Sequence, residues 1–476
     1  MTTTTSQSID SIPDLFRRQQ EHQSVLRNTT FRERRERLGR IDKFLSEERH
    51  IKELTKALWA DFRKPEAEVM ATEVMIIRQQ YRHIRRNLRR WMRDQGIPTP
   101  WPLIGTRSYI HYEPKGTCLI IAPWNYPFQL AVYPMLYGIA AGNTLMVKPS
   151  EMAPQTSAFL RNMVTELFPP EEVAVVEGDA EVAQALLDLP FNHVFFTGSP
   201  KVGKIVMQAA SRHLASVTLE LGGKSPAIIA PDASVKTAAE RTAWAKFLNN
   251  GQTCIAPDYV LVHESVRDAF ADAFCESIKT MYGHDHKAIQ ASADYSRIIN
   301  DRHFNRLRSL LDDATEGGAA TVFGGSYDAS DRFIMPTLLE HVSSDMRIMQ
   351  EEIFGPIMPM ITYREPEEAV DLINRHPKPL AFYINSRDQR TIRYFMENSS
   401  AGGTLVNDYM LGLSNPDLPF GGVNHSGIGK SLGFHGFVEF SNERSVIERR
   451  WGTLKPLYPP YTNLKSSIIR LLSRWA

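Results

Sequence analysis

The chain has 476 residues, a length at which a single hydrophobic core gives way to two or three domains. Hydrophobic residues make up 42% and charged residues 23% of the sequence, which is typical of a globular protein and excludes extensive disorder. The formal net charge of +1 provides no overall attraction for nucleic acid.

The cysteines and the N-terminal residues favour a reducing compartment. Three cysteines, Cys118, Cys254 and Cys275, are an odd number in a long chain and argue against a disulfide framework. None belongs to a Cys-x-x-Cys pair, so we predict no structural zinc site. Residues 1–10 lack the apolar core of a signal peptide, and no run reaches the roughly 20 apolar residues that span a bilayer. We therefore expect a cytoplasmic protein.

The first long segment, residues 11–93, is predicted to be helical. Its clearest part is an apolar stripe with spacings of three and four residues: Val74, Ile77, Tyr81, Ile84, Leu88 and Trp91. The other faces carry an arginine run between positions 78 and 93. This run could bind nucleic acid or lipid headgroups, but a solvated helix face is favoured because no aromatic residues interleave it.

Residues 94–114 contain several prolines and then become extended, so we predict an arm or hairpin outside the core. At the other end of the chain, the tail of residues 451–476 has the pattern of a short basic amphipathic helix. Its apolar positions are Leu464, Ile468, Ile469, Leu471, Leu472 and Trp475. We expect the tail to pack on the body; covering a substrate entrance and touching a membrane surface are the alternatives.

Between these ends, short apolar runs alternate with helical patterns. Predicted strands over residues 117–122, 144–148, 173–177, 193–197 and 217–220 alternate with predicted helices. This alternation predicts a parallel, doubly wound sheet that binds its ligand at the carboxyl ends of its strands. A second α/β pattern begins at residue 225, and we place a domain boundary near Gly222 and Gly223.

Cys254 ends a turn of small and polar residues that begins at Asn249 and is followed by Pro257. A cysteine on such a turn can be partly exposed, with backbone N–H groups that stabilise its thiolate, which makes it a candidate nucleophile. The alternative is a buried cysteine that acts as a small hydrophobe. The local sequence leaves these two interpretations balanced.

Two further polar residues stand where predicted strands end. Asn125 follows the strand over residues 117–122, where its amide could donate to a developing oxyanion or cap a helix. Glu220 ends the strand over residues 217–220. In apolar surroundings it would act as a base near neutral pH, whereas in solvent it would be an ordinary carboxylate.

Other motifs suit a nucleotide. Lys148 and Glu151 follow a predicted strand, where they could hold ribose hydroxyls or form a surface ion pair. The glycine turn with Gly198 and Ser199 opens a helix and offers N–H groups to a phosphate. It nearly matches a triphosphate-binding loop, but Ile205 replaces the Ser or Thr that holds magnesium. A nucleotide hydrolase is therefore only a distant alternative.

Three more segments remain open at this level. Residues 350–356 and 418–427 are aromatic and glycine-containing loops that could be structural or functional. Residues 284–286, with the sequence His-Asp-His, are a weak metal candidate, and a surface turn is favoured there. We predict no metal site.

Together these segments resemble the aldehyde dehydrogenase superfamily over residues 31–450, because the motifs occur in one order with matching separations. Residues 251–259 and the Tyr-Pro-Pro-Tyr of residues 458–461 resemble the class 3 group, which acts on fatty and aromatic aldehydes. The implied fold is α/β, with a Rossmann-like doubly wound cofactor domain, a second α/β catalytic domain and a small β oligomerisation arm. The boundaries are residues 1–93 and 115–223 for the NAD-binding domain, 224–440 for the catalytic domain, 94–114 and 441–450 for the arm, and 451–476 for the amphipathic tail.

The resemblance also implies a role for each candidate residue. Cys254 would be the nucleophile, Asn125 and the Cys254 N–H the oxyanion donors, and Glu220 the base that activates water, with Glu352 as the alternative base. The cofactor would be NAD, with NADP possible. Its implied contacts are Trp124, Lys148, Glu151, Gly198, Ser199, Leu221, Glu352 and Phe354.

In the implied reaction, the Cys254 thiolate adds to an aldehyde, hydride passes to the nicotinamide, and water activated by Glu220 hydrolyses the thioester to a carboxylic acid. A positioned base favours hydrolysis over transfer to coenzyme A. A semialdehyde or coenzyme A-acylating enzyme is therefore the closer alternative, and a binding protein without activity is a more distant one. Asn424 departs from the usual class 3 glycine near the substrate mouth. The implied assembly is a homodimer that takes a small aldehyde and no nucleic acid, with peripheral membrane contact through the tail as a possibility.

Overall fold

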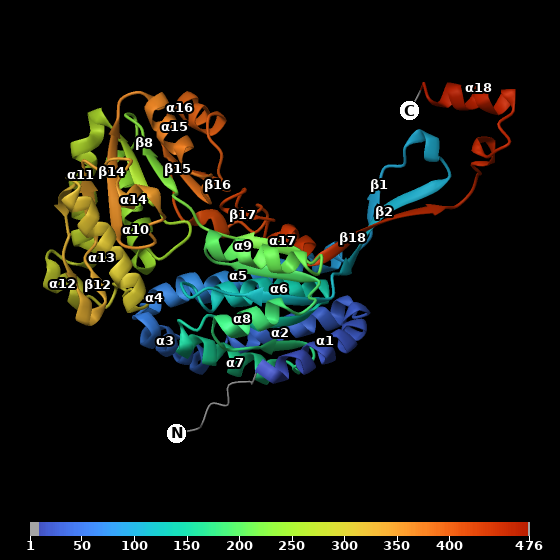
Figure 1. Ribbon diagram of the computed structural model, residues 1–476, viewed down its shortest axis with the longest axis horizontal. Coiled ribbons are helices and arrows are strands. Elements are labelled where there is room, and N and C mark those ends of the chain that lie inside the picture. Colours follow the sequence, from blue (N-terminus) through green and yellow to red (C-terminus); the bar gives the residue numbers. More distant parts are fainter. Residues whose placement is uncertain (1–8, 475–476) are drawn as a thin grey trace.

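The computed structural model describes residues 9–474, and its architecture is α/β (Figure 1). Two large sheets with helices on their faces form the body, and a thin arm extends away from it. The predicted fold class is confirmed. The predictions made for residues 1–8 and for Trp475 concern positions outside the described residues.

The first sheet has six strands in the order β17-β7-β6-β3-β4-β5, and every strand except β17 runs parallel to its neighbours. Alternate residues of each strand point to opposite faces, and both faces are covered, so the strands are continuously apolar. The strands are β3 (Thr117–Ile121), β4 (Thr144–Lys148), β5 (Val173–Val175), β6 (His193–Thr197), β7 (Ser216–Glu220) and β17 (Gly427–Ile428).

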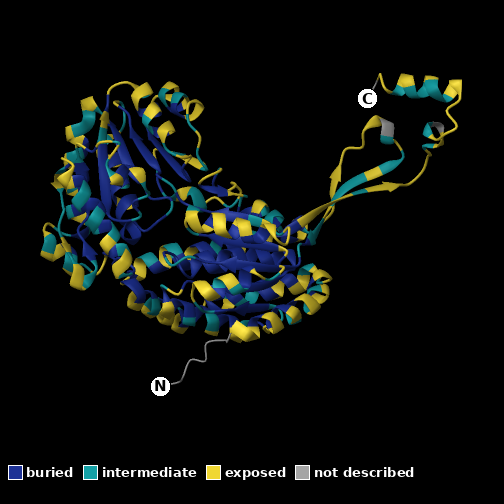
Figure 2. Ribbon diagram, viewed as in Figure 1, coloured by how far each residue is buried: buried dark blue, intermediate teal, exposed yellow. Residues whose placement is uncertain are grey.

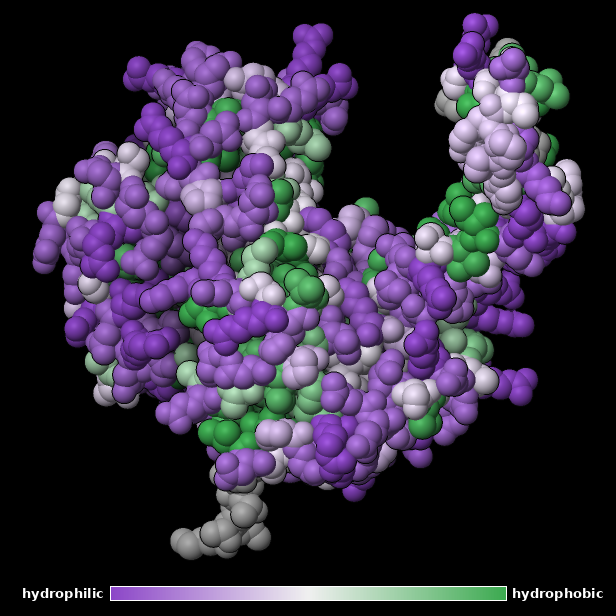
Figure 3. Space-filling model, turned by 45° about the vertical axis from the view of Figure 1, so that its right-hand side comes forward, coloured by the Kyte–Doolittle hydropathy of each residue, from purple (hydrophilic) through white to green (hydrophobic). Residues whose placement is uncertain are grey.

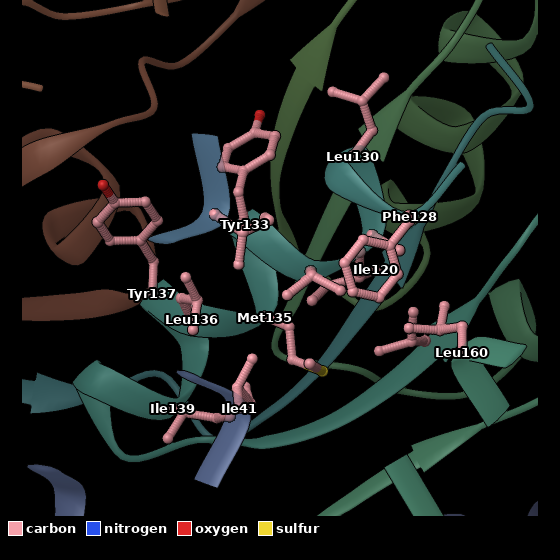
Figure 4. Close-up of a cluster of buried hydrophobic side chains, with 14 of the residues drawn as sticks. Ile41, Ile120, Phe128, Leu130, Tyr133, Met135, Leu136, Tyr137, Ile139 and Leu160 are labelled. Atoms are coloured by element: carbon pink, nitrogen blue, oxygen red, sulfur yellow. The ribbon is translucent and has the colours of Figure 1, made fainter. Parts of the chain in front are cut away.

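One face of this sheet carries the largest core cluster. Ile120 of the sheet belongs to the same cluster as Ile41, Leu136 and Leu160 from three different helices (Figure 4). The helices of this face are α2 (Phe31–Phe44), α3 (Glu48–Phe62), α5 (Met75–Trp91), α6 (Gln129–Ala141) and α7 (Pro154–Leu167). The opposite face is covered by α1 (Ile12–Arg27), α8 (Ala180–Leu187) and α9 (Pro200–Ser211).

The second sheet has seven strands in the order β10-β13-β14-β9-β8-β15-β16. Its strands are β8 (Pro226–Ile229), β9 (Tyr259–His263), β10 (Ala320–Phe323), β13 (Thr337–Glu340), β14 (Ile357–Tyr363), β15 (Ala381–Asn385) and β16 (Gly403–Val406). Helices α10 (Val235–Phe247) and α11 (Arg267–Tyr282) pack on one face. Helices α13 (Asp301–Glu316), α15 (Pro366–Arg375) and α16 (Gln389–Glu397) pack on the other. Both sheets therefore have buried interiors (Figure 2).

The helix that the apolar stripe predicted is longer than α5 alone. It begins with α4 (Glu66–Glu68), continues through a π-helical segment (Val69–Val74) and runs without a break into α5. A π-helical turn inside an α-helix often marks a functional site. The arginines at positions 82, 85, 86, 89 and 90 are exposed, in agreement with the favoured interpretation of a solvated face.

After completing the second sheet, the chain returns to the first. Strand β17 pairs antiparallel with β7, and α17 (Gly433–Glu439) packs against α5 and α6. These residues lie within the segment predicted as the catalytic domain, and the division into domains stays a prediction. The return has a direct consequence for the site, because it brings residues 430 and 431 to the carboxyl end of β7.

The arm is a three-stranded antiparallel sheet of β1 (Gln95–Ile97), β2 (Thr106–Pro114) and β18 (Ser441–Arg449). The tail helix α18 (Asn463–Leu472) lies at the far end of this arm and not on the body, so the expectation that it packs on the body is wrong (Figure 1). Hydrophobic side chains are visible on the arm (Figure 3). Among residues 9–474, no helix has both the length and the apolar character to cross a membrane.

Candidate active site

A cavity of about 430 Å³ opens where the carboxyl ends of β6 and β7 face loops of the second sheet. This is the edge at which a doubly wound sheet binds ligands. Nine of the eleven residues predicted for the site line it. They are Trp124, Asn125, Gly198, Ser199, Glu220, Leu221, Cys254, Glu352 and Phe354.

The turn that carries Cys254 is held by side-chain amides. Asn249 adopts a left-handed backbone conformation with φ of 53°, and its Nδ2 donates to the carbonyl oxygen of Asn125 at 2.9 Å. Asn125 in turn donates from Nδ2 to the carbonyl oxygen of Gln252 at 3.0 Å. A β-carbon at Gly251 would collide with the carbonyl oxygen of Gly355. The predicted oxyanion donor is therefore part of the scaffold that shapes the nucleophile's turn.

The surroundings of Cys254 act on the pKa of its thiol in opposite directions. Cys254 is only partly exposed, and burial, reinforced by the charges of Glu352 and Glu220, raises the pKa of its thiol to about 12. The backbone N–H groups of Cys254 and Ile255 lower this pKa, but their effect is smaller. Two carboxyl groups beside the sulfur, which the sequence could not reveal, therefore oppose the thiolate that the backbone N–H groups favour.

Glu220 is the last residue of β7, and it is 3% exposed. Ser431 donates from Oγ to Glu220 Oε1 at 2.7 Å, whereas Oε2 has no hydrogen-bond partner among residues 9–474. Burial raises the pKa of Glu220 to about 8, while Ser431 and Lys430 act in the opposite direction. The surroundings are thus of the kind in which a glutamate serves as a base near neutral pH.

Glu352 approaches the site from the second sheet. Its carboxylate lies against the backbone of Gly222, where a β-carbon would collide with both oxygens. Burial and the neighbouring Asp258 raise the pKa of Glu352 to about 8, whereas a hydrogen bond from the Gly223 N–H lowers it. Gly222 is therefore needed for the close approach of this carboxylate.

Ser199 and Gly198 lie at the start of α9. Ser199 is its N-cap, with Oγ accepting from the Val202 N–H at 3.4 Å, and Pro200 is the first helical residue. The positive end of this helix faces the cavity, as an anion such as a pyrophosphate requires. At Gly198 a β-carbon would collide with the ring of Phe196.

Lys148 and Glu151 are not brought into the cavity. They lie at the carboxyl end of β4, where Lys148 Nζ is 2.8 Å from Glu151 Oε2. The Lys148 side chain is 5% exposed and that of Glu151 is 42% exposed, so this pair is not fully at the surface. Because the Lys148–Glu151 pair lies at the same sheet edge as the cavity, the ribose contact stays a prediction.

Sequence reasoning missed several lining residues. His303 and Arg306 come from α13, where no local motif marks them, and Thr197 and Lys201 flank the turn at Ser199. Arg306 donates to the carbonyl oxygens of Glu352 and Ile353, which fixes the loop that carries Glu352. The Trp124 ring lies 4.9 Å from that of His303 and 5.4 Å from that of Phe354.

The cavity has chemistry that suits a dinucleotide. Several buried polar atoms have no partner within the described residues, namely Thr197 Oγ1, Glu220 Oε2 and both ring nitrogens of His303. They lie beside an aromatic wall of Trp124 and Phe354 and beside the N-terminus of α9. Aromatic surface, free polar atoms and a helix N-terminus match the rings, ribose hydroxyls and phosphates of such a cofactor.

The weak metal candidate was the His-Asp-His segment of residues 284–286, and two of its side chains make contacts within the protein. Asp285 caps α12 (His286–Ala291) by accepting from the Ala288 N–H, and His286 contacts Ser326 and Gln290. Within residues 9–474, no cluster of three or more His, Cys, Asp or Glu side chains is arranged to hold a metal ion.

Comparisons with known proteins point to one family. The model of the aldehyde dehydrogenase family matches residues 2–446. The chain is 46% identical over 414 residues to the 4,4'-diaponeurosporen-aldehyde dehydrogenase of Staphylococcus aureus. This alignment covers 87% of this chain and 88% of that protein. It is 37% identical over 455 residues to the Rattus norvegicus "aldehyde dehydrogenase, dimeric NADP-preferring", covering 95% and 98%. The solved substrate-bound state of Staphylococcus aureus AldH aligns with a TM-score of 0.91 and 42% identity, covering 97% and 99%.

Proposed function

The chain belongs to the aldehyde dehydrogenase family, whose members oxidise aldehydes with NAD(P), and we propose that this enzyme acts on medium- or long-chain aliphatic or aromatic aldehydes. The observation that carries the proposal is the convergence of Cys254, Glu220 and Asn125 on one cavity beside the start of α9. The name of the Staphylococcus aureus relative, a diaponeurosporen-aldehyde dehydrogenase, supports an apolar substrate.

We assign the chemical roles as follows. Cys254 is the nucleophile, and Asn125 Nδ2 and the Cys254 N–H stabilise the oxyanion that forms when sulfur adds to the carbonyl. Because burial raises the pKa of Cys254 to about 12, the thiol proton must be transferred as the sulfur attacks. Glu352 and Glu220 are the two carboxylates beside the sulfur that can accept it.

Completion of the reaction uses Glu220 as a base. When bound, the cofactor would supply the hydride acceptor, and Cys254 would then carry the acyl group as a thioester. Glu220 Oε2 is free to remove a proton from water, and the hydroxide adds to the thioester carbonyl. Collapse releases the carboxylic acid and the Cys254 thiolate. We propose that Ser431 orients Glu220 for this step.

The proposed cofactor contacts follow the lining of the cavity. Ser199, Gly198 and the N-terminus of α9 hold the pyrophosphate, Glu352 the nicotinamide ribose, and Trp124, Leu221 and Phe354 the rings. Lys148 and Glu151 hold the adenosine ribose from the end of β4. NAD is the proposed cofactor, with NADP as a second choice.

We further propose a cytoplasmic homodimer. The arm stands clear of the body and exposes Trp101, Ile104, Ile447 and Trp451, and the rat relative is named as dimeric. The three cysteines are free, as in a reducing compartment. The amphipathic helix α18, with Leu464 and Leu471 exposed, would permit peripheral contact with a membrane.

A substrate series tests the proposed function. We expect NADH formation with hexanal, decanal and benzaldehyde, with kcat/KM rising along the aliphatic series because each methylene group adds apolar burial. The C254A variant should form no NADH, and its thermal stability reports whether it is folded. Failure of all three aldehydes with a folded wild-type protein would contradict the proposed substrate class.

A further inference from the structure

A second cavity lies along the outer face of the helix that runs from α4 through the π-helical segment into α5. Its volume is about 820 Å³, larger than the cavity around Cys254, and the two share no lining residue. The helical residues of this groove recur at spacings of three and four, as one stripe of a helix must. The stripe includes Ala67, Met70, Ala71, Met75, Arg82 and Arg86, and Pro416 lies on the opposite wall.

The chemistry of the groove changes along its length. Its first part is apolar, and Met70 and Met75 are 40% and 57% exposed. The eight-residue step from Ala67 to Met75 corresponds to about 12 Å of helix, a length that suits a medium alkyl chain. Methionine side chains adapt their shape to such a chain. The second part is cationic, with Arg78, Arg82 and Arg86.

Two of these arginines are uncompensated. Arg78 Nε is paired with Asp42 Oδ1 at 3.2 Å. Neither Arg82 nor Arg86 forms a hydrogen bond or ion pair in the part of the chain that the structure describes.

One carboxylate opposes them from across the groove. Asp417 Oδ1 is 3.6 Å from His83 Nε2, and burial lowers the pKa of His83, which favours its neutral ring. Even if the charge of Asp417 is counted in full, this end of the groove remains positive.

We propose that this groove is a binding site for a free medium-chain fatty carboxylate, whose chain lies over the Met70 and Met75 part and whose carboxylate pairs with Arg82 and Arg86. Guanidinium groups form short, charge-assisted hydrogen bonds with carboxylates, and their fork matches both oxygens. The opposite wall is tied to the helix because Gln79 Nε2 donates to the carbonyl oxygen of Ser414. The ligand belongs to the class of product that an aliphatic aldehyde would give, but the site is separate from the catalytic cavity.

Nuclear magnetic resonance of the full chain, labelled with ¹³C at the methionine methyl groups and free of cofactor, tests this directly. Titration with decanoate should shift the Met70 and Met75 signals, assigned with the M70L and M75L variants, in a saturable manner. The R82Q/R86Q variant should bind at least about tenfold more weakly, because both charged hydrogen-bond donors are lost. The matched control R89Q/R90Q removes two exposed arginines of the same helix that do not line the groove, and it should bind as wild type does.

A second variant and two further ligands complete the test. A71W places a bulky side chain in the apolar part without changing charge, and it should abolish the shift of Met75. Equal affinity for decanol, or unchanged affinity in R82Q/R86Q, would overturn the proposal. Shifts caused by phosphatidylglycerol vesicles but not by decanoate would also overturn it, because the groove would then be a membrane contact. None of these measurements requires turnover, so their outcome is independent of the proposed function.

Discussion

The reacting groups of the catalytic cavity are all shifted toward their neutral forms. Burial raises the pKa of Cys254 to about 12 and those of Glu220 and Glu352 to about 8. Near pH 7 burial therefore favours the protonated forms of the thiol and of both carboxyl groups. The reaction therefore requires proton transfers. The pH dependence of acylation and of thioester hydrolysis should reveal them.

The first prediction concerns Glu220 and pH. The carboxylate is the active base, so thioester hydrolysis should accelerate as pH rises through about 8, where Glu220 loses its proton. In E220Q this dependence should disappear, and hydrolysis should slow by roughly 10²- to 10⁴-fold while acylation continues. Rapid-quench kinetics would detect the trapped acyl-enzyme as a burst of NADH.

An E352Q variant is the matched control for this experiment. It removes the other carboxylate beside Cys254 and leaves Glu220 in place. If E352Q, and not E220Q, accumulated the thioester, the assignment of the base would be reversed.

The second prediction concerns cofactor choice. Glu151 lies at the end of β4 with its side chain 42% exposed, and its charge should repel the 2′-phosphate of NADP. The E151Q variant should therefore raise the ratio of kcat/KM for NADP to that for NAD. The E177Q substitution is the control for general charge effects, because Glu177 forms an ion pair with Arg161 and is not a predicted cofactor contact. An unchanged ratio in E151Q would rule out the ribose contact.

For individual residues, the sequence predicts the side chains that end or follow a strand. It does not predict the side chains that reach the site through contacts between distant parts of the chain. Asn125, Ser199 and Glu220 share the carboxyl edge of a parallel sheet, so their convergence follows from the β/α alternation. Arg306 reaches the cavity, and Ser431 reaches Glu220, only through long-range packing of α13 and of the segment after β17. The effect of Glu352 on the thiol pKa of Cys254 could not be predicted for the same reason, because Glu352 lies in a loop of the second sheet.

Among the elements, the helix of residues 66–91 links the surface to the catalytic turn. Its π-helical segment carries Glu73, which is fully buried and forms an ion pair with the equally buried Lys64 at 3.1 Å. The Lys64 ammonium lies 3.8 Å from the centre of the Tyr126 ring. The Tyr126 hydroxyl is hydrogen-bonded to Thr253, the neighbour of Cys254, at 2.7 Å. This chain of contacts positions the turn that holds the nucleophile.

The third prediction follows from that chain. Removing one member of a buried ion pair leaves an uncompensated charge, so K64M should cost about 3–5 kcal/mol of stability. It should also slow alkylation of Cys254 by iodoacetamide, because the Tyr126 ring loses its support. Thermal unfolding and thiol-labelling rates measure the two effects.

The double variant K64M/E73Q removes both charges and serves as the control. It should recover much of the stability that K64M loses, because Glu73 is no longer left as an unpaired charge in the core. A double variant as unstable as K64M would show that packing of the lysine stem, and not the charge, is what matters.

Elements were predicted best where their pattern is local. The apolar spacing in α5 and the alternation of strands and helices were sufficient for the architecture. The π-helical segment could not be predicted from a local pattern. Its acidic neighbours make long-range contacts: Glu68 accepts from the Asn249 N–H, and Glu73 accepts from the Gln129 N–H. The two residues of β17 are too few for any periodic signal, although their pairing with β7 completes the site.

For the molecule as a whole, the arm is the part whose exposed hydrophobic side chains a partner chain would cover. Ile447 and Trp451 are 61% and 65% exposed on or next to β18. The fourth prediction is that I447D/W451D weakens dimerisation, because two charges would have to be buried in the interface. Sedimentation velocity should show a shift from dimer toward monomer.

The control for the arm is L214D, since Leu214 is 94% exposed on the body. It should sediment as wild type does. A wild-type protein that is monomeric at micromolar concentration would contradict the proposed dimer.

The division of the site between the two sheets has a consequence for how activity is encoded. Asn125 follows β3 and Glu220 ends β7 of the first sheet, whereas Cys254 and Glu352 lie in the loops that precede β9 and β14 of the second. A gene severed after codon 223 would thus yield two polypeptides, neither of which contains a complete set of reacting groups. Aldehyde oxidation would then report reunion of the fragments, in the manner of a split reporter, and not the folding of either one.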